Sequence, residues 1–499
     1  MLSKIASYLS ALSEKEYNLP NQLSNLVNYV LDSYYSKGEE YNRKQSENHV
    51  PLPPSDILAY ELWIKCDSLV AKSISEGYPS WLRNQYTYAF LKLMISGSYE
   101  IVPFVEKLDF FQELKRFEKF NTQYQQINID LDTSITAPVY GTYFLLNKRH
   151  NIPLIVEFDF CYMNPYSCSI KLKVNPKNEI VIQEFFDDFR HSVMVNDIYL
   201  KRCLEYNRGF LDFKRAKETT WNDIILKPDL IEKIRVNTVD VLANMSMLQS
   251  IGMCPTRNIL LVSPPGMAKT TIFNAINNET VGKCTKIWCT GKSLIHPEDV
   301  TGLYQAAKSL APCIVFIEDM DLFGENRFIG GNNKLLNEFL ACLEDNTGVI
   351  TMASTNAIES MDMALIDRPG RFDLKVIVPF PDAPDRGKML QLFCHQFHAK
   401  PDSSVTTETW KNVLDMTEGL TGAYIKELIK STVLNAASKG RIIKNAVIFN
   451  SDDLIKAAEQ VMDNYRTGQE ALRKQKSRIP TYSSASPEEV YPLAMKLPG

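Results

Sequence analysis

The chain has 499 residues, which is too long for one compact core, so we expect two to four domains. A hydrophobic share of 45% and a formal net charge of -4 are ordinary for a folded protein and argue against a nucleic-acid partner. The ten cysteines form no CxxC pair, which excludes a dense disulfide framework. We find no signal peptide and no apolar run of about 20 residues, so we expect a cytoplasmic protein without a membrane span.

The N-terminal part of the chain predicts two regions. Residues 1–118 form the first region, which we expect to be mainly helical because apolar residues recur there at roughly helical spacing. Residues 119–215 form the second, a small α+β domain. Its expected elements are a hairpin of 141–146 with 152–158, a second hairpin of 169–174 with 179–182, and a helix over 184–205.

A phosphate-binding loop is predicted in the middle of the chain. The apolar run 258–262 predicts a buried strand, and it leads directly into SPPGMAKT (residues 263–270) and then into a helical stretch. In such a loop the backbone N–H groups and the helix N-terminus face the phosphates. Lys269 would neutralise phosphate oxygens and Thr270 would ligate Mg²⁺.

This loop departs from the usual glycine pattern at two positions, where Ser263 and Ala268 stand in place of glycine. Small residues preserve the close approach of the backbone, but the Cβ of Ala268 restricts its φ angle. The alternative interpretation is a proline-rich turn before a helix.

A pair of carboxylates follows a second apolar run. Residues 313–317 predict a buried strand, and Glu318 and Asp319 stand at its end, with Asp321 two residues further on. Adjacent carboxylates at the carboxyl end of a buried strand are costly unless they hold a cation or activate water. One would hold Mg²⁺ and the other would polarise the attacking water. A solvated strand end is the alternative.

Two further motifs complete the pattern. Another buried strand, 349–355, ends at Asn356, whose amide could position the lytic water. The segment DRPGRFD (residues 367–373) brackets a Pro-Gly turn with Arg368 and Arg371, so we expect both arginines to point outward. An arginine supplied in trans to a γ-phosphate accelerates related chemistry by about 10³–10⁵. In isolation these motifs would be a strand-end turn and a surface turn.

Taken in order, these motifs resemble those of the AAA-proper subgroup of AAA+ ATPases. SPPGMAKT, FIEDMD, ASTN, DRPGRFD and GLTGAY (residues 419–424) are similar to its Walker A, Walker B, sensor 1, arginine-finger and lid motifs, and the likeness covers about residues 220–462. The resemblance implies an α/β fold: a P-loop AAA+ core with a parallel sheet between helices and a small helical lid. The implied boundaries are 216–383 for the large ATPase subdomain, 384–465 for the lid and 466–499 for a C-terminal tail.

The resemblance also assigns roles residue by residue. It implies an ATP hydrolase that uses ATP and Mg²⁺ and assembles into a ring, usually of six copies. The implied catalytic residues are Glu318, Asp319, Asn356, Arg368 and Arg371, and the implied metal site is Thr270, Glu318 and Asp319. The implied nucleotide contacts are Asp223 and Ile224 beside the adenine, Pro265, Gly266, Met267, Ala268, Lys269, Thr270 and Thr271 in the loop, and Gly422 and Ala423 in the lid.

Two departures refine the resemblance. The Glu318–Asp319 order reverses the family's usual Asp–Glu, and it occurs in proteins similar to the mitochondrial Rieske-protein translocase. Residues 185–213 also resemble that branch and its soluble bacterial relatives. The interval 291–298 lacks the aromatic-x-Gly pore motif of protein-threading members, which leaves Phe328 as a candidate pore contact or part of a mobile loop.

Three functions of different classes remain open. The first is a ring-forming ATPase that remodels or translocates a protein client chosen by residues 1–215. The second is a nucleotide-gated scaffold with little hydrolysis, which Ser263, Ala268 and Asp319 motivate. The third is a nucleic-acid motor, which the net charge of -4 disfavours.

Overall fold

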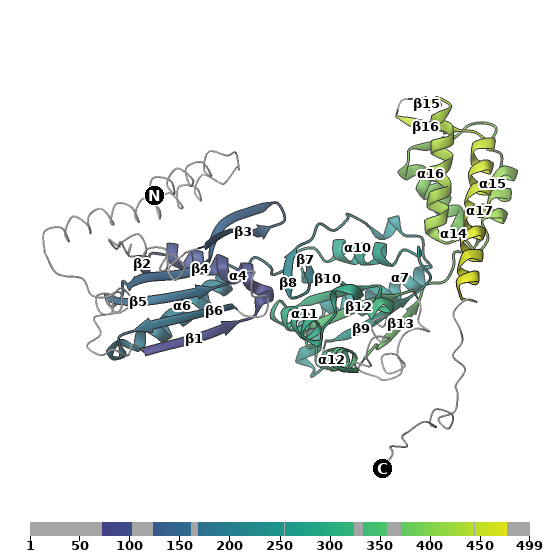
Figure 1. Ribbon diagram of the computed structural model, residues 1–499. Coiled ribbons are helices and arrows are strands. Elements are labelled where there is room, and N and C mark those ends of the chain that lie inside the picture. Colours follow the sequence, from purple (N-terminus) through teal and green to yellow (C-terminus); the bar gives the residue numbers. More distant parts are fainter. Residues whose placement is uncertain are drawn as a thin grey trace, which may run out of the picture. The chain divides into compact units, whose positions relative to one another are not determined.

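The fold is described for seven stretches of the chain, which are drawn in colour in Figure 1. These stretches divide into two compact units. In the computed structural model the described residues are 72–101, 123–160, 168–253, 255–323, 333–356, 371–443 and 445–476. The first unit comprises those within Met1–Thr219, Glu232–Val262 and Phe273–Val376. The second comprises those within Thr220–Ile231, Ser263–Ile272 and Ile377–Gly499. Within the described residues no helix is long and apolar enough to cross a membrane.

A six-stranded antiparallel sheet opens the first unit. Its order is β1-β6-β5-β4-β2, with β3 also paired to β4. Two helices pack with it, α4 (Arg83–Ile95) and α6 (Ile180–Val195). The rings of Phe90 on α4 and Phe158 on β5 stack at 4.1 Å, which ties the helix to the sheet. The strands are β1 (Lys72–Tyr78), β2 (Tyr99–Ile101), β3 (Gln123–Asp130), β4 (Thr133–Asn147), β5 (Ile152–Asp159) and β6 (Cys168–Val174).

The predictions for this part are confirmed for one hairpin and wrong in three places. β4 and β5 pair as expected around the turn that follows Asn147. The helical prediction for residues 1–118 is wrong for β1 and β2, which are strands of the sheet, so this sheet crosses the predicted boundary at 118. The second hairpin is also wrong, because residues 180–182 begin α6. The predicted helix 184–205 runs past the end of α6 into a strand at 203–207.

The start of α6 shows why the pattern misled. Ile180, Val181 and Ile182 are β-branched and favour a strand locally. The buried positions that follow, Phe185 and Phe189, continue at helical spacing, so tertiary packing of one helical face outweighs the local preference.

A seven-stranded sheet forms the other half of the first unit. Its order is β13-β9-β12-β11-β10-β7-β8, and β9, β12, β11, β10 and β7 run parallel. β7 and β8 pair antiparallel and extend its edge. The strands are β7 (Cys203–Asn207), β8 (Phe210–Phe213), β9 (Arg257–Val262), β10 (Thr285–Thr290), β11 (Cys313–Glu318), β12 (Val349–Thr355) and β13 (Leu374–Ile377).

The central strands are buried along nearly their whole length, as a parallel sheet between helices requires. Trp288 on β10 is 3% exposed and packs against Phe273 and Phe316. The α/β fold is therefore confirmed. The helices are α7 (Pro228–Arg235), a π-helical turn (Val236–Asp240), α8 (Val241–Ala243), α9 (Met245–Ser250), α10 (Lys269–Glu279), α11 (Pro297–Ser309) and α12 (Asn333–Glu344).

The second unit contains the helical lid. Its core is built from Val413, Leu428, Ile429 and Leu454, which are fully buried where the lid helices meet. The last helix continues to Lys476, past the predicted end of the lid at 465. The elements are α14 (Ala383–Gln396), β14 (Ala399–Pro401), α15 (Thr407–Met416), α16 (Gly422–Ser438), β15 (Ile442–Ile443), β16 (Ala446–Phe449) and α17 (Ser451–Lys476).

Seven cysteines fall within the described residues, and all seven are free thiols. Burial raises the pKa of each of them, for example to about 11 for Cys394, so they stay protonated near neutral pH.

Candidate functional site

The predicted phosphate loop joins the end of β9 to the start of α10. The Lys269 Nζ donates to the Ser263 carbonyl oxygen at 2.7 Å, the Ser263 Oγ at 3.0 Å and the Pro264 carbonyl oxygen at 3.2 Å. The Lys269 side chain is thus held inside the loop, where residue 269 is 8% exposed. A phosphate oxygen would take the place of these neutral acceptors. The first turn of α10 adds a helix dipole that favours an anion at this end.

The backbone of this loop needs two left-handed residues. Gly266 has φ +81°, and Ala268, at the position where glycine was expected, has φ +64°. An L-residue with a Cβ meets steric resistance in this region, so Ala268 carries local strain. Residue 268 therefore has the left-handed backbone that favours glycine, although it is an alanine.

The lid touches the phosphate loop at Gly266. The Ala423 backbone N–H donates to the Gly266 carbonyl oxygen at 3.1 Å. A Cβ added to Gly266 would lie 2.7 Å from the Ala423 Cβ and 2.9 Å from the Thr421 Oγ1, so only glycine fits there. The structure therefore brings together three predicted residues, namely Gly266, Gly422 at the start of α16, and Ala423.

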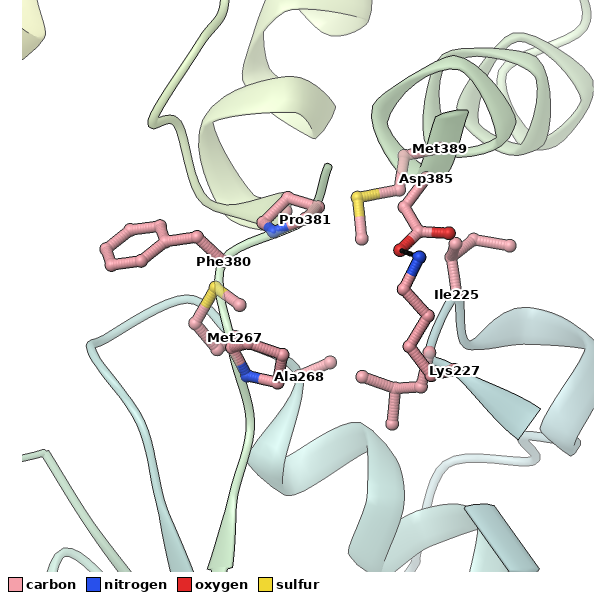
Figure 2. Close-up of a pocket in the computed structure, with 11 residues that line it drawn as sticks. Ile225, Lys227, Met267, Ala268, Phe380, Pro381, Asp385 and Met389 are labelled. Carbon is pink, nitrogen blue, oxygen red and sulfur yellow. Dashed lines mark ion pairs between the residues drawn. The ribbon is translucent and has the colours of Figure 1, made fainter. Parts of the chain in front are cut away.

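Beside this contact lies a pocket with mostly apolar walls (Figure 2). Two of its walls come from predicted residues, Met267 with Ala268 in the loop and Gly422 in the lid. Thioether, proline and phenyl groups form much of the remaining surface, which suits a flat apolar ring. The lining residues that the sequence did not predict are Ile225, Leu226, Lys227, Pro379, Phe380, Pro381, Asp385 and Met389.

The two residues predicted beside an adenine, Asp223 and Ile224, directly precede the segment that lines this pocket. The Asp223 carboxylate caps its own turn, accepting from the Thr220 backbone N–H at 2.8 Å and from the Thr220 Oγ1 at 2.9 Å. Ile224 is 5% exposed and is not among the residues that line the pocket. The pocket is lined instead by the next three residues, which were missed because this extended segment carries no motif.

The predicted carboxylates stand at the carboxyl edge of the seven-stranded sheet. Glu318 is the last residue of β11, and its Oε1 is buried without a hydrogen-bond partner among the described residues. Asp319 follows with φ +53°, and its Oδ1 accepts from the Asn356 Nδ2 at 3.1 Å. The predicted sensor and the second carboxylate are therefore in direct contact.

A third carboxylate fixes the sensor. Asp321 Oδ1 accepts from the Asn356 backbone N–H at 3.1 Å and from the Thr355 Oγ1 at 3.3 Å. These bonds join the end of β12 to the turn after β11, so Asn356 and Asp319 are positioned by the same short network. In the sequence Asp321 lies two residues after the predicted carboxylate pair, but no motif indicates that it orients Asn356.

The predicted arginines have different outcomes. Arg371 is 7% exposed, and its Nε lies 3.1 Å from the Glu344 Oε1, so the expectation that it points outward is wrong. The neighbouring residues explain its position, because Phe372 is buried and the Asp373 carboxylate accepts from the Asn258 backbone N–H. Arg368 lies outside the described residues, as does Phe328.

The remaining predicted site residues lie in the loop and its helix. Pro265 and Thr270 are exposed, and Thr271 is half-buried in the first turn of α10. An exposed Thr270 hydroxyl next to the phosphate cradle suits a metal ligand. A phosphate loop after a parallel strand, a carboxylate pair at the sheet edge and an apolar pocket under a helical lid together define a P-loop nucleotide-binding domain.

Comparison with known proteins agrees with this class. Residues 259–380 match the family model described as "ATPase family associated with various cellular activities (AAA)". An "ATP-dependent zinc metalloprotease FtsH" of Pirellula staleyi is 32% identical over 259 residues, which cover 49% of this chain and 35% of the relative. The protein of that name from Thermus thermophilus is 29% identical over 285 residues, which cover 54% of this chain and 43% of the relative. Residues 259–380 therefore form an ATPase domain of the AAA family.

The chain spans less than half the length of these two relatives, at 35% and 43%. The match supports the AAA family and does not select the branch of the Rieske-protein translocase. The relatives are named as zinc metalloproteases, whereas the described residues of this chain contain no group of three or more His, Cys, Asp or Glu side chains that could hold a metal ion.

Proposed function

We propose that this protein hydrolyses Mg-ATP, using the phosphate loop, the carboxylates that follow β11 and the lid. The observation that carries the proposal is the hydrogen bond from the Asn356 Nδ2 to the Asp319 Oδ1 at 3.1 Å. It holds a carboxylate and an amide together at the end of adjacent parallel strands, which is the arrangement that orients an attacking water.

The residues present fit a magnesium ion. The Glu318 Oε1 is buried without a partner among the described residues, and a buried carboxylate oxygen of this kind is costly unless a cation or its water shell satisfies it. We propose that Thr270 and Glu318 hold Mg²⁺, which would neutralise charge on the phosphate oxygens. With Glu318 in that role, Asp319 polarises the water and Asn356 orients it.

The other roles follow from position. Lys269 would leave the loop carbonyls and bind phosphate oxygens, supported by the backbone of Pro265 to Thr271. The apolar pocket beside Met267 would take the base, with Asp223 and Ile224 preceding the segment that lines it. Gly422 and Ala423 would close the lid over the nucleotide.

We also propose how the protein assembles and what it acts on. We propose a homohexameric ring in which Arg368 reaches the neighbouring copy's ATP, while Arg371 would have to leave Glu344 to do so. The names of the relatives indicate proteins that act on other proteins. We therefore propose a cytoplasmic motor that remodels or translocates a protein client bound by residues 1–215. The Glu318–Asp319 order supports the branch of the Rieske-protein translocase.

One alternative has a specific observation in its favour. The strained backbone of Ala268 and the short carboxylate of Asp319 would suit a nucleotide-gated scaffold that binds ATP and hydrolyses little. We weigh it second because Asn356 is hydrogen-bonded to Asp319, a contact that nucleotide binding alone does not need. A nucleic-acid motor ranks third, and salt-dependent binding to DNA or RNA would be its evidence.

Asp319→Asn separates the first two functions. If the protein is an ATPase, wild type releases phosphate steadily. The variant then binds ATP with similar affinity, and its turnover is slower by a factor of about 100 or more. The scaffold predicts that wild type is already idle and that the variant does not differ from it. Turnover per subunit that rises with protein concentration, and is lost in Arg368→Ala, would support sites shared between copies.

A further inference from the structure

Lys227 connects two segments that line the apolar pocket of Figure 2 and that are far apart in the sequence. Its Nζ donates to the Asp382 Oδ2 and lies 3.0 Å from the Asp385 Oδ2. Lys227 ends the extended segment before α7, whereas the two aspartates stand at the start of α14. Figure 2 shows the side chains of Lys227 and Asp385 reaching toward one another at one side of the pocket.

Both ends of this connection are fixed by their backbones. The Lys227 carbonyl oxygen accepts from the backbone N–H groups of Leu230 at 3.0 Å and Ile231 at 3.2 Å, so the first turn of α7 fixes its position. The Asp382 Oδ1 caps α14 by accepting from the Asp385 backbone N–H at 2.9 Å. The backbone is therefore ordered at both ends of the connection, and the Asp382 carboxylate is oriented by its cap.

Burial makes the pair with Asp385 more than an ordinary surface contact. The Asp385 side chain is 9% exposed, and a carboxylate at that depth requires a cation nearby. Lys388 lies 3.9 Å from its other oxygen, but it is 64% exposed and belongs to the same helix, so it cannot join two segments. The hydrogen bonds to Asp382 and Asp385 raise the pKa of Lys227 above its ordinary value, so the ammonium persists at neutral pH.

We propose that Lys227 is a positioning residue that keeps the nucleotide pocket closed, because its ion pairs with Asp382 and Asp385 hold the segment before α7 against the lid. This inference rests on the proposed nucleotide site. Lys227 acts here through Asp382 and Asp385 rather than through the nucleotide. Release of a bound nucleotide then requires that these ion pairs separate, so the rate of release depends on ionic strength.

The test is the dissociation rate of a fluorescent ADP analogue from the full-length chain, measured by stopped flow with excess ADP as competitor. Lys227→Met should release the analogue roughly fivefold faster than wild type, the size expected for two partly exposed ion pairs. Its association rate should change little. Raising the salt from about 50 mM to about 500 mM should accelerate release from wild type by a larger factor than release from Lys227→Met, because only wild type has the ion pairs of Lys227 to screen. Lys227→Arg keeps the charge and should restore slow release.

Lys388→Met is the matched control, since it removes a lysine near Asp385 that does not bridge two segments, and it should release the analogue at the wild-type rate. Wild-type release from Lys227→Met, or equally fast release from Lys388→Met, would overturn the proposal. If Lys227→Met does not fold, salt-independent release from wild type would overturn it equally. Failure of the wild-type chain to bind any nucleotide is a separate outcome, which would refute the proposed function itself.

Discussion

Replacing the strained Ala268 of the phosphate loop by glycine is expected to stabilise the protein. Ala268 has φ +64°, a region in which an L-residue costs roughly 1–2 kcal/mol. Ala268→Gly removes this cost from the folded state. Glycine also gives the unfolded chain more conformational freedom, which lowers the free energy of unfolding by about 0.4–1 kcal/mol and offsets part of the gain. We therefore expect the variant to be more stable by roughly 1 kcal/mol, although most alanine-to-glycine changes destabilise a protein.

The assay is urea unfolding followed by tryptophan fluorescence, with Ala275→Gly as the matched control. Ala275 lies inside α10, where it is 1% exposed, so the same substitution should lower stability there by about 1 kcal/mol or more. The two variants should thus shift the midpoint in opposite directions. If Ala268→Gly lowers stability as Ala275→Gly does, the left-handed backbone at position 268 is wrong.

Three further predictions test other parts of the account. Gly266→Ala should weaken ATP binding at least about tenfold in a fluorescence titration, because its Cβ would lie 2.7 Å from the lid's Ala423 Cβ; an unchanged affinity would refute the contact. Asn356→Ala should lower kcat by about tenfold or more with little change in KM, since its amide contacts the water-polarising carboxylate; a raised KM with unchanged kcat would indicate a binding role instead. Burial is the largest single influence on the pKa of Asp453 and raises it, but the hydrogen bonds from Lys439 and from the Asn450 backbone N–H, together with the charge of Arg441, outweigh burial. The net pKa therefore lies below the ordinary value, so lid stability should be present at neutral pH and lost on acidification below about pH 4; an equally steep loss in Asp453→Asn would contradict this.

The order of the motifs along the chain was enough to predict the α/β core. Each strand before a motif, from β9 to β12, is a run of apolar residues buried on both faces, and such runs are readable from sequence. The phosphate loop and the contact of Asn356 with Asp319 follow from parallel strands ending at one edge of the sheet.

What the sequence did not predict depends on contacts between distant residues. Arg371 pairs with Glu344, and no local pattern distinguishes a buried arginine from a turn arginine. Lys227 and Asp385 also lie far apart in the chain, and their pairing arises only when the lid folds. Ile180 favours a strand locally, but it begins α6 because the buried face of this helix packs in the core.

The central claim is that this site hydrolyses ATP, and the most direct test is steady-state phosphate release from Mg-ATP by wild type and Lys269→Met. We expect steady release by wild type and loss of release in the variant, because Lys269 is the cation of the phosphate loop. Wild type that binds ATP but releases no phosphate would contradict the claim. Equal release by both proteins would place the activity outside this site.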